Sequence, residues 1–166
     1  MNRPSVIKLA SSSSLPTCKD VYLLERISRE YQASLQRRRD GEEALRATAN
    51  YKWEEYPSAV HKDVKLFHST LEFTVDALRI GIADLVQFCG RIFPEYAGVD
   101  LEIKHSHLKC FAGVFYTLEG YYLGEKFFPG GDKLFACSVT SCYDKKDLDS
   151  YLEGCKAAAE RKEDLA

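Results

Sequence analysis

Residues 71–96 read LEFTVDALRIGIADLVQFCGRIFPEY and predict a long apolar helix that ends at a proline hinge. Six side chains recur at helical spacing and form one apolar stripe: Leu71, Val75, Leu78, Ile82, Leu85 and Cys89. A second stripe lies on another side of the same helix: Phe73, Ala77, Ile80 and Phe88. We expect this helix to start near Lys62 and to run to about Phe93, because Pro94 cannot continue it. A helix that is apolar on two sides must be covered on more than one side.

A second apolar helix is predicted after the hinge, from Leu108 to Leu123, where Lys109 and Glu119 are the charged residues. The fold class that follows is all-α, a layered helical sandwich in which these two helices cross in contact. Neither helix is a membrane span, because charged residues such as Asp84 interrupt the first one. One shared core is expected from these residues: Phe88, Phe93, Tyr96, Leu108, Phe111 and Phe115.

The flanking segments add a helix on each side and a small β element. Residues 1–16 are predicted to be disordered, and residues 17–166 to form the helical domain. Thr17 is expected to cap a first helix that stops at Arg37-Arg38-Arg39-Asp40-Gly41, because basic residues followed by glycine are a stop signal. Residues 42–57 are expected to form a loop or short helix held by Tyr51, Trp53 and Tyr56. Residues 127–139 predict a β-turn or hairpin, and residues 147–165 a final solvent-facing helix.

Composition limits the kind of function. The 166 residues are enough for one domain with a core, and the net charge of −2 gives no support for a surface that binds polyanions. No secretory segment is predicted at the start of the chain. The 6 cysteines are scattered and contain no C-x-x-C pair, which argues against a structural zinc module. They are typical of an intracellular protein that uses cysteine as a small hydrophobe, with Cys89 and Cys110 expected on buried helix faces.

The hinge lies in the run Cys89-Gly90-Arg91-Ile92-Phe93-Pro94-Glu95-Tyr96, which Val99, Lys104, Leu108 and Lys109 continue. With the order of helices and β-turn from about Cys18 to Tyr151, this run resembles the ligand-binding domain of nuclear receptors, particularly the divergent nematode group. Six positions fit the family pattern: Gly90, Arg91, Pro94, Tyr96, Lys104 and Leu108. Three positions depart from it: Cys89 for an aromatic, Ile103 for an acid and His107 for a leucine.

The resemblance implies a module of transcription regulation, either nuclear or shuttling from the cytoplasm to the nucleus. It implies a partial domain without the zinc-finger DNA-binding domain, so that this chain makes no direct contact with nucleic acid or membrane. The helices that complete the family's sandwich are expected to be missing at the C-terminal side. Their absence should expose apolar residues of the Leu71–Ile82 stripe or of the 116–121 region, which favours self-association.

The resemblance also implies two sets of binding residues. A small lipophilic ligand is expected against these pocket candidates: Val75, Asp76, Arg79, Ile82, Tyr116, Thr117, Gly120 and Tyr121. A coregulator helix is expected on a surface that includes Arg91, Lys104, Leu108 and Lys109. Arg91 would hold the C-terminus of that helix, although it equally suits the dipole of its own helix. For Asp76 and Arg79 we favour a surface ion pair over a ligand anchor, and for Gly113 and Gly120 a close helix crossing is an equal explanation.

Other chemistries lack support in the sequence. His105 and His107 are two residues apart, which is the wrong spacing for joint metal ligation on a helix. Asp144, Asp147 and Asp149 predict an acidic helix start and not a calcium loop. No nucleophile or cofactor motif is present, so we expect no enzymatic activity and no cofactor. The alternative function is a structural or protein-interaction module whose core is filled by its own side chains.

Overall fold

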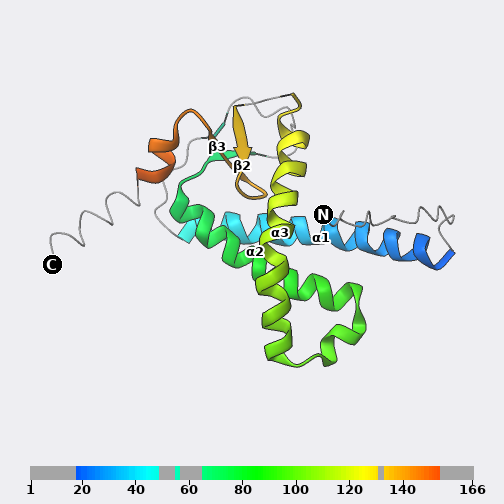
Figure 1. Ribbon diagram of the computed structural model, residues 1–166. Coiled ribbons are helices and arrows are strands. Elements are labelled where there is room, and N and C mark those ends of the chain that lie inside the picture. Colours follow the sequence, from blue (N-terminus) through cyan, green and yellow to red (C-terminus); the bar gives the residue numbers. More distant parts are fainter. Residues whose placement is uncertain (1–17, 49–54, 57–64, 131–132, 154–166) are drawn as a thin grey trace, which may run out of the picture.

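The computed structural model describes residues 18–48, 55–56, 65–130 and 133–153. These residues are mostly helical, with a small sheet of three short strands. The main helices are α1 (Cys18–Thr48), α2 (Leu71–Ile92) and α3 (Leu101–Phe127). Figure 1 shows α3 crossing in front of α1 and α2, with the sheet beside the C-terminal end of α3. The all-α prediction with one small β element is therefore confirmed at the level of fold class.

α1 does not stop at Gly41, as the sequence predicted, but continues to Thr48. Gly41 lies where α1 meets α2, and a Cβ atom there would lie 3.0 Å from the Ile80 Cγ2 atom. The glycine permits a close approach of the two helices and does not end its own helix. The predicted cap Thr17 and the predicted anchors Tyr51 and Trp53 lie outside the described residues.

α2 begins later than predicted and ends as predicted. Thr70 caps it by accepting a hydrogen bond from the Phe73 backbone N–H at 3.2 Å, so the helix starts at Leu71 and not near Lys62. Pro94 then opens a short 3₁₀ helix, η1 (Pro94–Gly98). Asp100 caps α3 through the Glu102 N–H at 2.8 Å, so α3 is longer at both ends than the predicted segment 108–123.

The hairpin is confirmed, and the structure adds a third strand to it. β2 (Leu134–Ala136) pairs antiparallel with β3 (Ser141–Asp144). The unpredicted strand is β1 (Phe67–His68), which pairs parallel with β3 at the register Phe67↔Ser141. Two residues are too few to show an alternating pattern in the sequence. A helix then starts at the exposed Leu148 and is described to residue 153, and the remainder of the predicted segment 147–165 lies outside the described residues.

The hydrophobic core lies where α1 and the end of α3 meet the sheet, and not between α2 and α3. Its buried members are Leu35, Leu66, Leu123, Phe127, Phe128, Ala136, Val139 and Cys142. Tyr56 packs against this core, as the sequence predicted. Burial raises the pKa of Cys142 to about 12, which keeps its thiol protonated in the manner of a small hydrophobe.

The predicted aromatic core between α2 and α3 is wrong. Phe93 and Phe111 are 49% and 50% exposed, and the other four members are only partly buried: Phe88, Tyr96, Leu108 and Phe115. Cys110 is also exposed, against expectation. The two helices do meet, through Phe88 and Phe115, whose ring centres are 6.5 Å apart. The remaining aromatics are left open because the strongest packing of α2 is against α1.

The two stripes of α2 have different fates. Phe73 and Ala77 of the second stripe are buried, whereas Val75 and Leu78 of the first are each 41% exposed and only Leu85 of the first is buried. Leu118 and Tyr121 of α3 are 64% and 68% exposed. Apolar surface is therefore exposed in both regions where the sequence predicted it. Within the described residues, no helix combines the length and the apolar composition that crossing a membrane requires.

Candidate binding groove between α2 and α3

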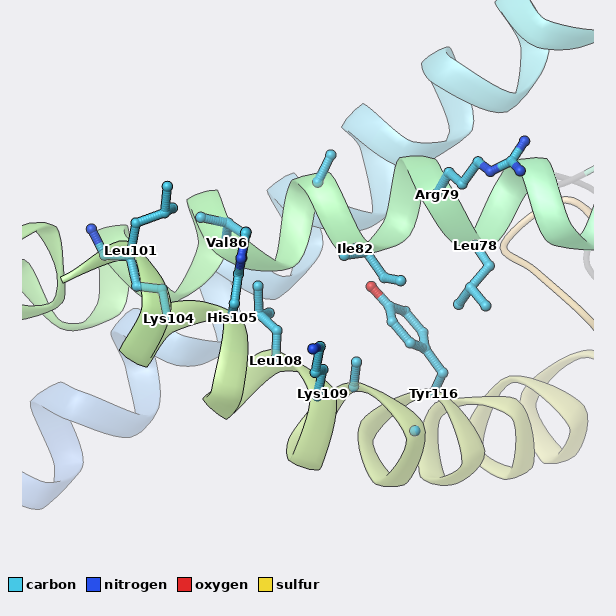
Figure 2. Close-up of a pocket in the computed structure, with 13 residues that line it drawn as sticks. Leu78, Arg79, Ile82, Val86, Leu101, Lys104, His105, Leu108, Lys109 and Tyr116 are labelled. Atoms are coloured by element: carbon cyan, nitrogen blue, oxygen red, sulfur yellow. The ribbon is translucent and has the colours of Figure 1, made fainter. Parts of the chain in front are cut away.

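A groove of about 850 Å³ lies between α2 and α3. Figure 2 shows its two walls, with the labelled α2 residues on one side and the labelled α3 residues on the other. The α2 wall consists of Leu78, Ile82, Ala83 and Val86, and the α3 wall includes Leu101, Leu108 and Ala112. The groove exists because α2 packs one apolar face against α1, and α3 packs one face against the sheet. The apolar residues on the other faces of α2 and α3 line the groove and remain only partly covered.

Among the described residues that line the groove, four have basic side chains and none has an acidic one: Arg79, Lys104, His105 and Lys109. The Lys104 ammonium donates to the Ala97 carbonyl at 2.9 Å and lies 5.6 Å from the centre of the Tyr96 ring. This contact fixes Lys104 at the end of the groove next to η1. Arg79 is already paired with Asp76, so Lys104 and Lys109 supply the positive charge that favours an apolar partner with negative charge.

Tyr116 separates this groove from a smaller pocket of about 270 Å³, and Leu78 also lines both. The Tyr116 hydroxyl rests on Gly81, where an added Cβ would lie 2.9 Å from that oxygen. The Arg38 guanidinium lies 5.2 Å from the centre of the Tyr116 ring. Burial raises the pKa of Tyr116 above its ordinary value, so the hydroxyl stays protonated.

A buried ion pair lies beside the smaller pocket. Arg38 of α1 donates from both terminal nitrogens to Glu119 of α3, each at 2.7 Å. The Tyr31 hydroxyl donates to the same carboxylate at 3.0 Å. Both charged side chains are 5% exposed, so they are paired in a poorly hydrated interior. This pair joins α1 to α3.

Two further polar contacts join α1 to its other neighbours. Asp84 of α2 accepts from the Arg37 Nε atom at 2.6 Å and from the Ser34 hydroxyl. Glu42 accepts from the Ser138 hydroxyl at 2.7 Å and from the Thr140 N–H at 3.1 Å, which ties α1 to the β2–β3 turn. Burial raises the pKa of Glu42 above its ordinary value.

The sequence interpretation missed this polar network, because it treated residues 37–39 as a helix end. A usable signal was present: Ser34, Arg38, Glu42 and Arg46 recur every four residues and place a polar stripe on one face of α1. All four are buried. Glu119, a single acid within the apolar part of α3, was the matching signal on the partner helix.

The pocket candidates divide between the two hollows. Arg79, Ile82 and Tyr116 line the groove. Tyr116, Thr117, Gly120 and Tyr121 line the smaller pocket, and Val75 and Asp76 line neither. Asp76 instead pairs with Arg79 at 2.5 Å near the surface, which confirms the interpretation that we favoured.

The glycines of α3 do not mark a helix crossing. At Gly120 an added Cβ would lie 3.3 Å from the Phe135 ring, so this glycine admits strand β2. At Gly113 nothing lies within 4 Å of that position. The close helix contacts occur at Gly41 and Gly81 instead.

Of the coregulator candidates, Lys104, Leu108 and Lys109 line the groove and Arg91 does not. Arg91 lies 3.8 Å from the Glu30 carboxylate of α1. The C-terminus of α2 is held by another arginine, since the Arg26 guanidinium donates to the Ile92 carbonyl at 2.6 Å. Arg91, which is 53% exposed, therefore lies near α1 and is not among the residues that line the groove.

Metal binding gains no support from the geometry. Among the described residues, no group of three or more histidine, cysteine or acidic side chains could hold a metal ion. Asp147 accepts from the Ser150 N–H at 3.2 Å, as an acidic helix start requires, and Asp144 accepts from the Lys146 N–H at 2.8 Å in the turn before the helix. Comparison with protein-family models, curated proteins and solved structures gave no match to this chain.

Proposed function

We propose that the protein is a non-enzymatic regulatory module whose α2–α3 groove binds the apolar face of an acidic amphipathic helix. The observation that carries this proposal is the apolar groove, in which the charged lining residues that the structure describes are all basic: Arg79, Lys104 and Lys109. The resemblance to nuclear-receptor ligand-binding domains suggests that the partner is a coregulator in transcription regulation, and that the module acts in the nucleus.

The shape of the groove suits a helix. Its α2 wall extends from Leu78 to Val86, which is about 12 Å along a helix axis. Two helical walls with an open top accept a third helix through side chains spaced three and four residues apart. A small lipophilic ligand in an open groove would leave much of its apolar surface in water. An amphipathic helix would bury its apolar face in the groove and expose only its polar face to water.

The charges of the groove select among helices. His105 and Lys109 are exposed beside Leu108, on the α3 wall. Glutamates that flank the apolar face of the partner helix would lie near these side chains. Exposed ion pairs of this kind contribute little affinity, but they favour one orientation and accelerate encounter.

A small lipophilic ligand is the second candidate, and the pocket behind Tyr116 favours it. Thr74, Thr117 and Ser138 supply hydroxyl groups there, next to the apolar Leu78 and Leu123. Movement of the Tyr116 ring would connect this pocket with the groove. A ligand of this kind would lie under the helix site and not compete with all of it.

The test uses fluorescence anisotropy with the full chain and a labelled peptide whose leucines lie at positions i, i+3 and i+4 between glutamates. We expect saturable binding, weakened at least tenfold by Ile82→Asp and by Leu108→Asp. Leu148→Asp is the matched control, because Leu148 is exposed and lies outside the groove. Circular dichroism confirms that each variant is folded.

A second peptide with lysines in place of the glutamates tests the charge argument. We expect it to bind more weakly than the acidic peptide, and Lys109→Glu to reduce that preference. Equal binding of both peptides, or binding that Ile82→Asp leaves unchanged, would contradict the proposed site. A neutral lipophilic probe whose binding survives Leu108→Asp but is lost with Tyr116→Ala would favour the second candidate.

A further inference from the structure

The outer face of α3 carries an apolar stripe that the other described elements leave half or more exposed, and at its C-terminal end Tyr121 contacts the Phe135 ring of β2 and Tyr122 contacts the Tyr31 ring of α1. Its large members are Phe111, Val114, Leu118, Tyr121 and Tyr122, which are 50%, 56%, 64%, 68% and 50% exposed. His107 and Glu125, both exposed, lie on the same side of the helix at the two ends of this run, and Ile103, which is 49% exposed, lies one turn before His107. At 100° per residue, these eight side chains fall within an arc of about 100° around the helix. Figure 1 shows this helix in front of the other two.

We infer that this stripe is the site where a second copy of the chain docks, with the two α3 helices antiparallel across a two-fold axis at residue 116. Four of the five large members are symmetric in pairs about that residue. Phe111 then faces Tyr121 of the other copy, and Val114 faces Leu118. A two-fold interface requires this property, because the same patch must complement itself.

The polar ends of the stripe select the antiparallel arrangement. His107 and Glu125 are also symmetric about residue 116, so each imidazole meets the carboxylate of the other copy. A histidine has an N–H to donate in either protonation state. A parallel arrangement would instead place Glu125 against Glu125, which is unfavourable.

The stripe is separate from the proposed helix-binding groove. The α3 residues that line the groove include Leu108, Ala112 and Tyr116, which lie on the other side of the helix from Val114 and Tyr121. Self-association does not therefore depend on the proposed function. Either proposal can fail without the other.

Sedimentation equilibrium on the full chain tests the inference. We expect a reversible monomer–dimer equilibrium, with a dissociation constant raised at least tenfold by Leu118→Glu. Leu24→Glu is the matched control, because Leu24 is 62% exposed on α1, and it should leave the constant unchanged. A chain that stays monomeric at all concentrations, or a dimer that Leu118→Glu does not weaken, overturns the inference.

The arrangement of the two copies has its own tests. His107→Glu should weaken the dimer by repulsion from Glu125, and adding Glu125→Lys should restore it. Failure of the charge exchange to restore the dimer overturns the antiparallel arrangement.

Discussion

At the scale of single residues, Glu119 adds a buried polar contact between α1 and α3, two helices that also share the hydrophobic core through Leu35 and Leu123. It accepts hydrogen bonds from Arg38 and Tyr31 of α1 while it lies on α3. The paired charges are 5% exposed, so each depends on the other for the solvation that it has lost. The position of α3 against α1, and with it the position of one groove wall, depends on this contact.

Glu119→Ala should lower the free energy of unfolding by about 3–5 kcal/mol, because it leaves the Arg38 charge buried without a partner. Asp76→Ala is the control, since it removes an ion pair in which the Arg79 side chain is 75% exposed, and it should cost less than about 1 kcal/mol. Urea unfolding followed by circular dichroism measures both. The double change Arg38→Met with Glu119→Leu should recover much of the loss. Equal costs for the two single variants would show that the buried pair is not a structural contact.

At the scale of elements, the glycines mark which helices are in close contact. Gly41 allows α1 to approach Ile80 of α2, whereas no atom lies within 4 Å of a Cβ placed at Gly124 of α3. Gly124→Ala should therefore stabilise the protein by about 0.4–1 kcal/mol, because alanine restricts the unfolded chain and fits the helix. Gly41→Ala should lose that gain and destabilise, because Ile80 must move. Thermal unfolding measures the stability of both variants. A stability gain from Gly41→Ala would mean that α1 and α2 are less closely packed than the structure shows.

The elements that the sequence predicted well are those set by local chemistry. Pro94 ends α2 whatever packs around it, and the glycines and proline of residues 129–131 precede a hairpin. The misjudged elements depend on distant partners. Arg38 and Gly41 look like a helix end until Glu119 and Ile80 are seen opposite them. The candidate site divides in the same way. Helical periodicity predicted that Ile82 and Leu108 belong to it, whereas Arg91 lies near Glu30 of α1, a distant residue that the local sequence does not reveal.

At the scale of the whole molecule, α3 has three faces in three different environments. One face is fixed to α1 and the sheet through Glu119, Leu123 and Phe127, which are all buried. A second face lines the groove, and the third carries the stripe from Phe111 to Tyr121. Because the first face is anchored, a partner on the second face has no evident means of moving the third.

Helix binding and self-association should therefore be thermodynamically independent. The acidic peptide at 100 times its dissociation constant should raise the free energy of unfolding by about 2.7 kcal/mol, because it binds only the folded state. Leu118→Glu should leave that increment unchanged, and the saturating peptide should leave the dimer dissociation constant unchanged. Urea unfolding and sedimentation equilibrium with and without peptide measure the two quantities. Binding free energies are reciprocally linked, so a shift in one measurement must come with an equal shift in the other. Such a paired shift would show that α3 moves between two positions, and that its anchor at Glu119 is not rigid.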